Sequence, residues 1–280
     1  MTAATDPAQL RERYGPWAVV AGGSEGVGRE FATQLADAGV HLVLLARKPE
    51  PLEETAAMCR ERGVDVRTIA MDLTAPDAVA RLTAVTDDLE VGLLIYNAGA
   101  NTHSAEFLDG DLEAFGQVIT LNITTQMALV QHYGRPMRDR GRGGILLIGS
   151  MAGYMGSTRH SVYGGVKAFG RIFAESVWVE LRKQGVDVVE LVLGVTRTPA
   201  MERVGLNFDA PGFHASDPAD VARQGLASLG HGPVVIAEGN EEGARIRSAV
   251  DERAKLVAGA DKRMRQLMEG STQHGTEASK

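Results

Sequence analysis

The sequence predicts an α/β protein with a doubly wound parallel sheet, and three observations support this fold class. Short apolar segments such as Val40–Ala46 alternate with longer segments that carry apolar residues at helical spacing. Continuous apolar runs are typical of strands covered on both faces, as in a parallel sheet. The chain also has 33 glycines in 280 residues, which suits tight turns between strands and helices.

Composition and charge narrow the class of function. The 29 basic and 36 acidic side chains give a formal charge of −7, so no general attraction to nucleic acid or anionic membranes is expected. Cys59 is the single cysteine, which excludes an internal disulfide, and no metal site is expected. No signal peptide is recognisable, and no stretch approaches the ~20 apolar residues of a membrane span. We therefore expect a cytoplasmic protein without a nucleic-acid or membrane partner.

A glycine loop stands between the first strand and the helix that follows it. The expected strand is Trp17–Ala21, the loop reads Gly-Gly-Ser-Glu-Gly-Val-Gly over 22–28, and Arg29–Ala38 has helical spacing. This order is typical of a dinucleotide site, because glycines let the backbone approach the pyrophosphate and the helix N-terminus faces it. A glycine-rich turn without a ligand is the alternative.

The other expected strands end in small or polar residues. These strands are 40–46, 64–70, 93–96, 144–148, 186–192 and 234–236. Ligands of open α/β sheets bind outside the carboxyl ends of the strands, so the residues that follow should meet at one edge. Arg47 follows the second strand, where an arginine would pair with a 2′-phosphate, and this favours NADP(H) over NAD(H). A solvated arginine at a strand end is the alternative.

Tyr163 and Lys167 lie four residues apart on an expected helix over 161–183. Residues at this spacing share one helix face, and an ammonium beside a phenol lowers a phenol pKa that is otherwise about 10. The pair is a candidate proton donor and acceptor, although the same spacing also occurs on solvated helix faces. A long helix from about Asp111 to Met137 carries Asn122 in its middle, where a buried asparagine needs a specific partner.

We expect one domain with an extension at each end. Residues 1–12 should form a mobile segment, 13–237 the dinucleotide-binding and catalytic domain of about seven strands with helices on both faces, and 238–280 a C-terminal helix and a disordered tail. The helix is expected over 241–268. The interval 200–217 lacks periodicity and is interpreted as a functional lid, with disorder as the alternative.

Six landmarks in a fixed order resemble the pattern of a known family. They are Gly22-x-x-x-Gly26-x-Gly28, Asp72, Asn97-Ala98-Gly99, Asn122, Ser150 and Tyr163-x-x-x-Lys167. With the tyrosine 13 positions after the serine, the set resembles the short-chain dehydrogenase/reductase family in its compact single-domain branch, over about residues 14–236. The resemblance implies a Rossmann fold. The opening over 14–20 also looks like the subgroup of hydroxysteroid dehydrogenases and long-chain 3-ketoacyl reductases.

The resemblance implies a role for each matching residue. Tyr163 is the expected acid/base, and Lys167 lowers its pKa and holds the nicotinamide ribose. Ser150 orients the substrate oxygen, and Asn122 supports a proton-relay water. The residues expected to contact the cofactor are Gly22, Ser24, Glu25, Gly26, Val27, Gly28, Arg47, Asp72, Leu73, Asn97, Ala98, Gly99, Tyr163, Lys167, Val195 and Thr198. Of these, Ser24 and Arg47 match positions that bind the 2′-phosphate.

Three positions depart from the family pattern, none of them among the four expected catalytic residues. Ala21 replaces a threonine that ties the glycine loop to a neighbouring strand. Tyr96 replaces an asparagine, and Leu193 replaces a proline, which leaves the path of the nicotinamide loop open.

We therefore expect an NADP(H)-dependent oxidoreductase that interconverts a ketone or aldehyde and an alcohol. A regulatory or sensor protein that binds NADP(H) with little turnover is the alternative, and an epimerase or dehydratase would usually have a longer chain. Apolar residues around the expected pocket suggest an acyl, steroid-like or aromatic substrate, or else lid packing: Met151, Met155, Met201, Val204, Leu206 and Phe208. Family members assemble through two long helices, here 111–137 and 161–183, so a homodimer or homotetramer is expected.

Overall fold

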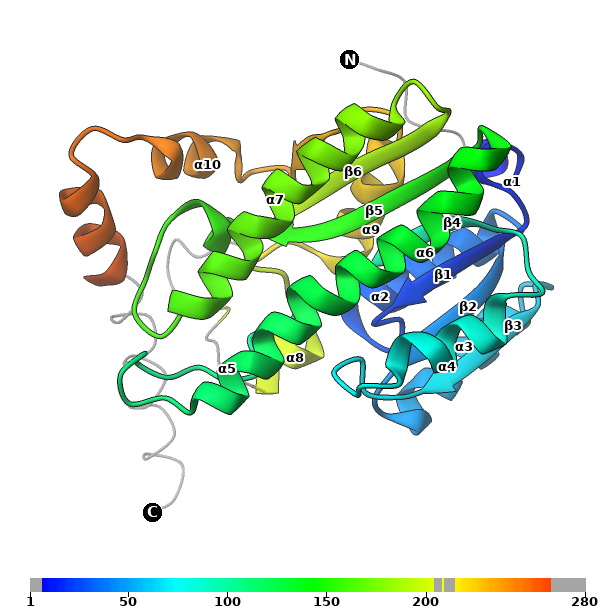
Figure 1. Ribbon diagram of the computed structural model, residues 1–280, viewed down its shortest axis with the longest axis horizontal. Coiled ribbons are helices and arrows are strands. Elements are labelled where there is room, and N and C mark those ends of the chain that lie inside the picture. The colour runs from blue at the N-terminus through cyan, green and yellow to red at the C-terminus, as the bar shows by residue number, and fades with distance from the viewer. Residues whose placement is uncertain (1–6, 204–207, 209–214, 263–280) are drawn as a thin grey trace.

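A seven-stranded parallel sheet organises the chain in the computed structural model, which describes residues 7–203, 208 and 215–262 (Figure 1). The strands are β1 (Trp17–Ala21), β2 (His41–Ala46), β3 (Val66–Ala70), β4 (Val91–Tyr96), β5 (Gly143–Ser150), β6 (Val186–Leu193) and β7 (Val234–Ile236). Their order is β3-β2-β1-β4-β5-β6-β7, and all pairings are parallel. The fold class expected from the sequence, a doubly wound Rossmann sheet, is confirmed.

Helices cover both faces of the sheet, and α6 and α7 cross it in the foreground of Figure 1. The helices are α1 (Pro7–Tyr14), α2 (Gly26–Asp37), α3 (Pro49–Arg60), α4 (Ala78–Thr86), α5 (Leu112–Ile119), α6 (Thr125–Arg140), α7 (Ser161–Leu181), α8 (Pro199–Arg203), α9 (Pro218–Ser228) and α10 (Glu241–Ser248). One core cluster joins α2, α3 and α9 to the sheet, and a second joins α4, α6 and α7 to its other face. Fully buried side chains such as Phe31 and Leu129 each contribute about 1.5–3 kcal/mol through burial.

The strand order places a topological switch point between β1 and β4. The chain moves outward from β1 to β3 and then returns to β4 on the other side of β1, so the loops after β1 and β4 diverge. Ligands of open α/β sheets bind at such a switch point, outside the carboxyl ends of the strands. The glycine loop after β1 and the Asn97–Gly99 turn after β4 both lie there.

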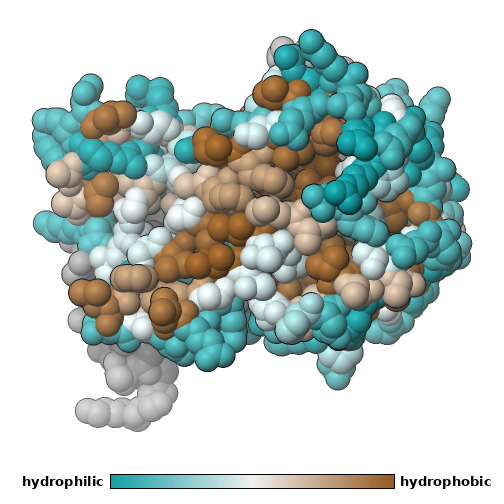
Figure 2. Space-filling view, in the orientation of Figure 1, coloured by the Kyte–Doolittle hydropathy of each residue, from teal (hydrophilic) through white to brown (hydrophobic). Residues whose placement is uncertain are grey.

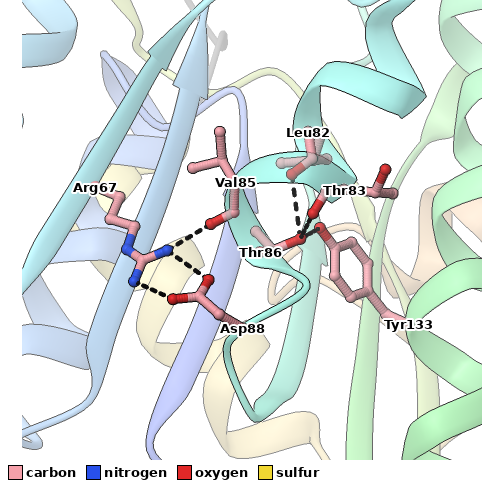
Figure 3. A network of polar contacts seen from close by, with 7 residues as sticks. All are labelled: Arg67, Leu82, Thr83, Val85, Thr86, Asp88 and Tyr133. Carbon is pink, nitrogen blue, oxygen red and sulfur yellow. Dashed lines mark hydrogen bonds and ion pairs between the residues drawn. The ribbon is translucent and has the colours of Figure 1, made fainter.

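A polar network fixes the C-terminal end of α4 to the neighbouring β3 and α6 (Figure 3). The Arg67 guanidinium of β3 donates to the Val85 carbonyl at 2.7 Å and to both oxygens of Asp88. The Thr86 hydroxyl lies 2.9 Å from the Tyr133 hydroxyl of α6. These contacts stabilise the position of α4, which carries none of the expected site residues, so their role is structural.

Residues 7–12 belong to helix α1, where the sequence suggested a mobile segment. Leu10 and Tyr14 are each 2% exposed. The Tyr14 hydroxyl donates to Oδ2 of Asp187 at 2.8 Å, and Arg13 donates to the same oxygen at 2.7 Å. The start of β6 thus anchors α1, a long-range contact that the local sequence does not reveal.

The C-terminal extension contains a break that the sequence did not predict. The helix expected over 241–268 ends as α10 at Ser248, and Glu252 has a left-handed φ of 53°. Residues 253–262 form a second helical segment, and 263–268 lie outside the described residues. Within the part of the chain that the structure describes, no helix combines the length and apolarity that a membrane span requires.

Candidate active site

The glycine loop has a backbone that only glycine adopts without strain. Gly22 and Gly26 have φ values of +83° and +54°, in the left-handed region. A Cβ on Gly28 would lie 1.8 Å from the Gly22 carbonyl oxygen. The loop and the start of α2 therefore form a cradle with no side chain in the way, and this fits the pyrophosphate of a dinucleotide at a helix N-terminus.

Asn97 ties the glycine loop to β4 and supplies the link that Ala21 lacks. Its side-chain amide donates to the Gly22 carbonyl at 2.9 Å, and its backbone N–H donates to the Ala21 carbonyl at 3.0 Å. The amide N–H groups of Gly22 and Gly23 donate to the Leu45 carbonyl at the end of β2. The glycine loop is therefore held from β4 and from β2, although Ala21 lacks the threonine hydroxyl.

The short helix α8 lies against the glycine loop. A Cβ on Gly26 would be 2.9 Å from Cγ2 of Thr198. Glu25 makes no side-chain cap on α2, and its carboxylate instead accepts from Arg203 at 3.0 Å. This hydrogen bond is the main reason that the pKa of Glu25 is lowered. Half-buried Val195 lies just before this region, and its carbonyl accepts from Ser216 at 2.9 Å.

Four of the residues expected to contact the cofactor follow the ends of β1, β2 and β3. Arg47 is exposed directly after β2, and none of the described residues forms a hydrogen bond or ion pair with its guanidinium. Ser24 is half-buried, and its carbonyl accepts from the Thr55 hydroxyl at 3.0 Å. Asp72 is exposed and accepts from the backbone and the hydroxyl of Thr74 at 2.8 Å, whereas Leu73 is 5% exposed.

Asn122 lies in a π-helical turn between α5 and α6, where the sequence suggested one continuous helix. The turn spans Thr120–Thr124, and such turns are frequent at functional sites. The Asn122 amide donates to the carbonyls of Val118 at 2.9 Å and Ala100 at 3.2 Å. Its Oδ1 is buried, and none of the described residues donates to it. An orphaned buried acceptor fits a bound water, the group that the resemblance assigns to this asparagine.

Tyr96, the second departure from the family pattern, supports this turn. Its hydroxyl donates to the Leu121 carbonyl at 2.5 Å. A π turn leaves carbonyls without their usual helical partners, so the phenol satisfies one of them. The substitution thus fixes the backbone beside Asn122.

Asn122 and Lys167 approach each other across Gly99. A Cβ on Gly99 would lie 2.6 Å from Nζ of Lys167 and 2.9 Å from Oδ1 of Asn122. The turn after β4 therefore brings together two polar atoms from separate helices. Any side chain on Gly99 would push them apart.

Tyr163 and Lys167 face the same region from one side of α7. Nζ of Lys167 lies 5.7 Å from the centre of the Tyr163 ring and donates to the Ile148 carbonyl at 2.9 Å. Burial raises the pKa of Tyr163, while a hydrogen bond with Ser150 acts to lower it. The expected net lowering by the lysine is therefore not found in this structure, where loss of solvent around the phenol dominates.

Ser150 ends β5 and places its hydroxyl beside the tyrosine. Its Oγ accepts from the Ala152 N–H at 3.1 Å and so caps the 3-10 helix Met151–Tyr154. In the β5–β6 register Ser150 lies opposite Leu193. The third departure, Leu193 in place of proline, is accommodated as the last residue of β6.

A cleft of about 570 Å³ lies between the loop before Tyr163 and the C-terminal segment. Its lining residues are Gly156, Ser157, Thr158, Ser161, Arg253, Ala254, Val257, Ala258 and Asp261. The Thr158 N–H donates to Asp261 at 2.9 Å, and Arg253 donates to the Tyr154 carbonyl at 2.7 Å. The C-terminal segment is thus fastened to the loop that leads into α7.

Glu190, which was not among the expected site residues, is a buried acid whose charge interacts with that of Lys167. Glu190 lies in the middle of β6 and is 2% exposed, and Lys167 is 8% exposed. Burial raises the pKa of Glu190 and lowers that of Lys167, and each charge opposes the shift of the other. The signal was available: Glu190 is a single acid within the otherwise apolar run Val188–Leu193.

Comparison with known proteins agrees with this geometry. The chain is 33% identical over 251 residues to a 7beta-hydroxysteroid dehydrogenase of Clostridium sardiniense, covering 89% of this chain and 95% of that protein. It is 35% identical over 198 residues to a very-long-chain 3-oxoacyl-CoA reductase of Neurospora crassa, covering 69% of this chain and 59% of that protein. Both kinds of enzyme were expected from the resemblance over 14–20, which is confirmed.

Solved structures give the same result. A structure described in a study of 7beta-hydroxysteroid dehydrogenase stereoselectivity has a TM-score of 0.81 at 29% identity and covers 89% of this chain and 98% of its own. A short-chain dehydrogenase from Sphingobium yanoikuyae in complex with NADPH has a TM-score of 0.73 at 28% identity and covers 90% and 95%.

The short chain dehydrogenase family model matches residues 16–207, which is more than half of the chain and includes all four expected catalytic residues. Its members bind nicotinamide cofactors, which agrees with the glycine cradle after β1. This chain belongs to the short-chain dehydrogenase/reductase family and is an oxidoreductase.

Proposed function

We propose that this protein is a cytoplasmic NADP(H)-dependent oxidoreductase that interconverts an apolar ketone or aldehyde and its alcohol, with Tyr163 as the acid/base. The observation that carries this is the convergence of Tyr163, Lys167 and the orphaned Oδ1 of Asn122 beside the glycine cradle. A phenol, an ammonium and a free amide oxygen close together can transfer one proton to or from a bound substrate. The single cysteine and the composition support a reducing compartment.

The residues divide the work around one substrate oxygen. When bound, a reduced nicotinamide supplies hydride to a carbonyl carbon, which leaves negative charge on the oxygen. The Tyr163 hydroxyl donates a proton to that oxygen, and the Ser150 hydroxyl donates a hydrogen bond to it. The Lys167 ammonium stabilises the phenolate that remains. Oδ1 of Asn122 accepts from a water that returns a proton toward the lysine.

A panel of ketones and alcohols followed by nicotinamide absorbance tests this function. The panel should include a steroid ketone, a long-chain 3-ketoacyl thioester and an aryl ketone, each with NADPH and NADH. We expect turnover of at least one with NADPH. Cofactor binding without turnover of any of them would instead support the sensor alternative.

An apolar substrate is supported by the cleft and by the named relatives. Ala254, Val257 and Ala258 give the cleft an apolar wall beside the loop before Tyr163. The apolar residues suggested for the pocket differ in their burial and in what they contact. Met151 packs in a cluster with Val192 and Ala244 under α10, which makes it a packing residue. Met155 and Met201 are half-buried, the Phe208 ring lies 4.6 Å from Arg197, and Val204 and Leu206 lie outside the described residues.

Arg47→Asp should reverse the cofactor preference. In this proposal the exposed Arg47 guanidinium pairs with the 2′-phosphate, and loss of charge-assisted hydrogen bonds of about 1.5–3 kcal/mol corresponds to a rise in the KM for NADPH of about 10- to 100-fold. The carboxylate would also accept from the 2′-hydroxyl of NADH. Steady-state kinetics with both cofactors measure this, with Arg81→Asp on exposed α4 as the control. An unchanged preference for NADPH would count against this role of Arg47.

Exposed apolar residues on α5–α7 support a homodimer or homotetramer. Figure 2 shows apolar surface gathered on the face that α6 and α7 cover in Figure 1. The large apolar side chains exposed on these elements are Leu112, Ile119, Met127, Phe169, Ile172 and Val179. A contiguous apolar face of this kind is typical of a protein interface.

Ile172→Asp should therefore lower the sedimentation coefficient. Ile172 is 54% exposed, and a carboxylate there would be buried without a partner in an interface. Val250→Asp, at a residue that is 83% exposed outside these helices, should leave the assembly intact. Wild-type protein that sediments as a monomer at micromolar concentration would contradict the proposed assembly.

A further inference from the structure

We propose that Glu190 is a positioning residue for Lys167, and that its buried carboxylate keeps the lysine side chain charged from behind the active site. This inference rests on the proposed function, in which the ammonium stabilises the Tyr163 phenolate. It concerns a residue of the sheet core that lies outside the four expected catalytic residues.

The position of Glu190 in β6 makes its carboxylate an exception in the core. It pairs in register with Leu147 of β5, and its neighbours Val189 and Leu191 are fully buried apolar residues. A buried carboxylate far from any opposite charge is costly, so it persists where a partner compensates it. The partner must come from the helix that covers this part of the sheet.

Two glycines make the space for the carboxylate between β5 and α7. A Cβ on Gly149 would lie 2.5 Å from Cδ of Glu190, and a Cβ on Gly170 would lie 3.2 Å from its Oε1. Gly170 comes three residues after Lys167, so both lie on the same face of α7. The carboxylate therefore lies between β5 and the face of α7 that carries Lys167.

Lys167 needs a compensating charge. Its ammonium has three N–H donors, and the one described acceptor is the carbonyl of Ile148 at 2.9 Å. A carbonyl carries no net charge, so it does not offset the loss of solvent around the ammonium. The coulombic effect of Glu190 acts in the opposite direction to this burial and favours the protonated lysine.

Other charges around Glu190 also come from α7. Besides Lys167, the charge of Arg171 lowers the pKa of Glu190, and that of Glu175 raises it. Arg171 lies over the Tyr154 ring, 4.2 Å from its centre. Of these three charged residues, Lys167 is the one to which the proposed function assigns a part in the reaction.

Glu190 should therefore affect the pH range over which the enzyme is active. A neutral amine at position 167 would not stabilise a phenolate on Tyr163, and it would lose the charge that favours binding of the ribose. Glu190 delays deprotonation of the lysine as the pH rises. The charges of Glu190 in β6 and of the Tyr163 phenolate in α7 therefore both favour the protonated form of Lys167.

The direct test is an NMR titration of the protein without cofactor. The chain has six lysines, so ¹³Cε and ¹⁵Nζ labelling of lysine gives a small set of signals, and Lys167→Arg identifies the one from Lys167. In Glu190→Gln we expect Lys167 to titrate at a pH lower by on the order of one unit, the usual effect of removing a nearby opposite charge. Glu190→Asp should stay near the wild-type value. The control Glu180→Gln, at an exposed acid of α7, the helix that carries Lys167, should leave the Lys167 titration unchanged.

A kinetic experiment links this titration to turnover. The high-pH limit of kcat/KM for carbonyl reduction should move down with the lysine titration in Glu190→Gln and be restored in Glu190→Asp. A residue with a merely structural role would lower the melting temperature of the variants without moving that limit.

The outcomes separate this proposal from the proposed function. An unchanged Lys167 titration in Glu190→Gln overturns the role of Glu190, whatever the activity. If that variant does not fold, Glu190→Ala carries the same expectation and the same contradicting result. If the wild type turns over no substrate while the titration shifts as expected, the proposed function fails and the electrostatic link stands.

Discussion

Tyr163→Phe should lower kcat/KM for carbonyl reduction by about 10²–10⁴-fold, the usual contribution of a general acid. The substitution removes one hydroxyl and keeps the ring that packs 5.7 Å from the lysine nitrogen. Without the hydroxyl, the oxygen that gains negative charge has only the Ser150 donor beside it. Cofactor affinity should remain, because the glycine cradle is untouched. Steady-state rates and quenching of protein fluorescence by NADPH measure the two quantities.

Tyr154→Phe is the matched control for this prediction. Tyr154 is a half-buried phenol of the neighbouring 3-10 helix, and its ring lies under Arg171. Its hydroxyl has no place in the proposed proton transfer, so this variant should keep the wild-type rate. Full activity in Tyr163→Phe would end the acid/base assignment.

Lys167→Met should destabilise the fold by about 3–5 kcal/mol at pH 8, the usual cost of leaving a buried charge without the opposite charge that compensates it. The substitution leaves Glu190 as a buried carboxylate without its main compensating charge. It should also abolish turnover, because the phenolate of Tyr163 loses its cation.

The loss of stability should depend on pH in a defined direction. Burial raises the pKa of Glu190 to about 7 even in the presence of Lys167, above the ordinary value of about 4.3. A group with a raised pKa contributes stability that is present below its unfolded pKa and lost as the pH rises through its folded pKa. The deficit of Lys167→Met relative to wild type should therefore be small near pH 5 and large at pH 8.

Urea unfolding of both proteins at the two pH values measures this deficit. The double variant Lys167→Met, Glu190→Gln removes both charges and should recover part of the stability at pH 8. A deficit that is equal at pH 5 and pH 8 would show that lost packing of the lysine stem, rather than the orphaned charge, is responsible.

The parts of the structure that depend on local pattern could be predicted from the sequence. The strands were recognised because continuous apolar runs follow from burial on two faces, and the glycine loop because left-handed φ values at Gly22 and Gly26 require glycine. Tyr163 and Lys167 were paired because helical spacing fixes their common face. Each of these inferences needs only a short window of sequence.

The features that were missed depend on contacts between distant segments. The π turn around Asn122 exists where Tyr96 satisfies a carbonyl from another element, and α1 is held by Asp187, which lies 173 positions after Tyr14 in the sequence. The raised pKa of Tyr163 reflects how deeply the fold buries it, which spacing does not reveal. Glu190 was visible as an acid in an apolar strand, yet its partner lies on a helix that crosses that strand.

Gly149 and Gly170 have a consequence for how such proteins diverge. An alanine at either place would bring a methyl group within 2.5–3.2 Å of the Glu190 carboxyl group. Glu190 of β6, Gly149 of β5 and Gly170 of α7 are therefore expected to change together during evolution. Relatives that carry alanine at either glycine should also have lost the acid, and those that keep the acid should keep both glycines. Covariation among these positions would record a buried charge that no short motif describes.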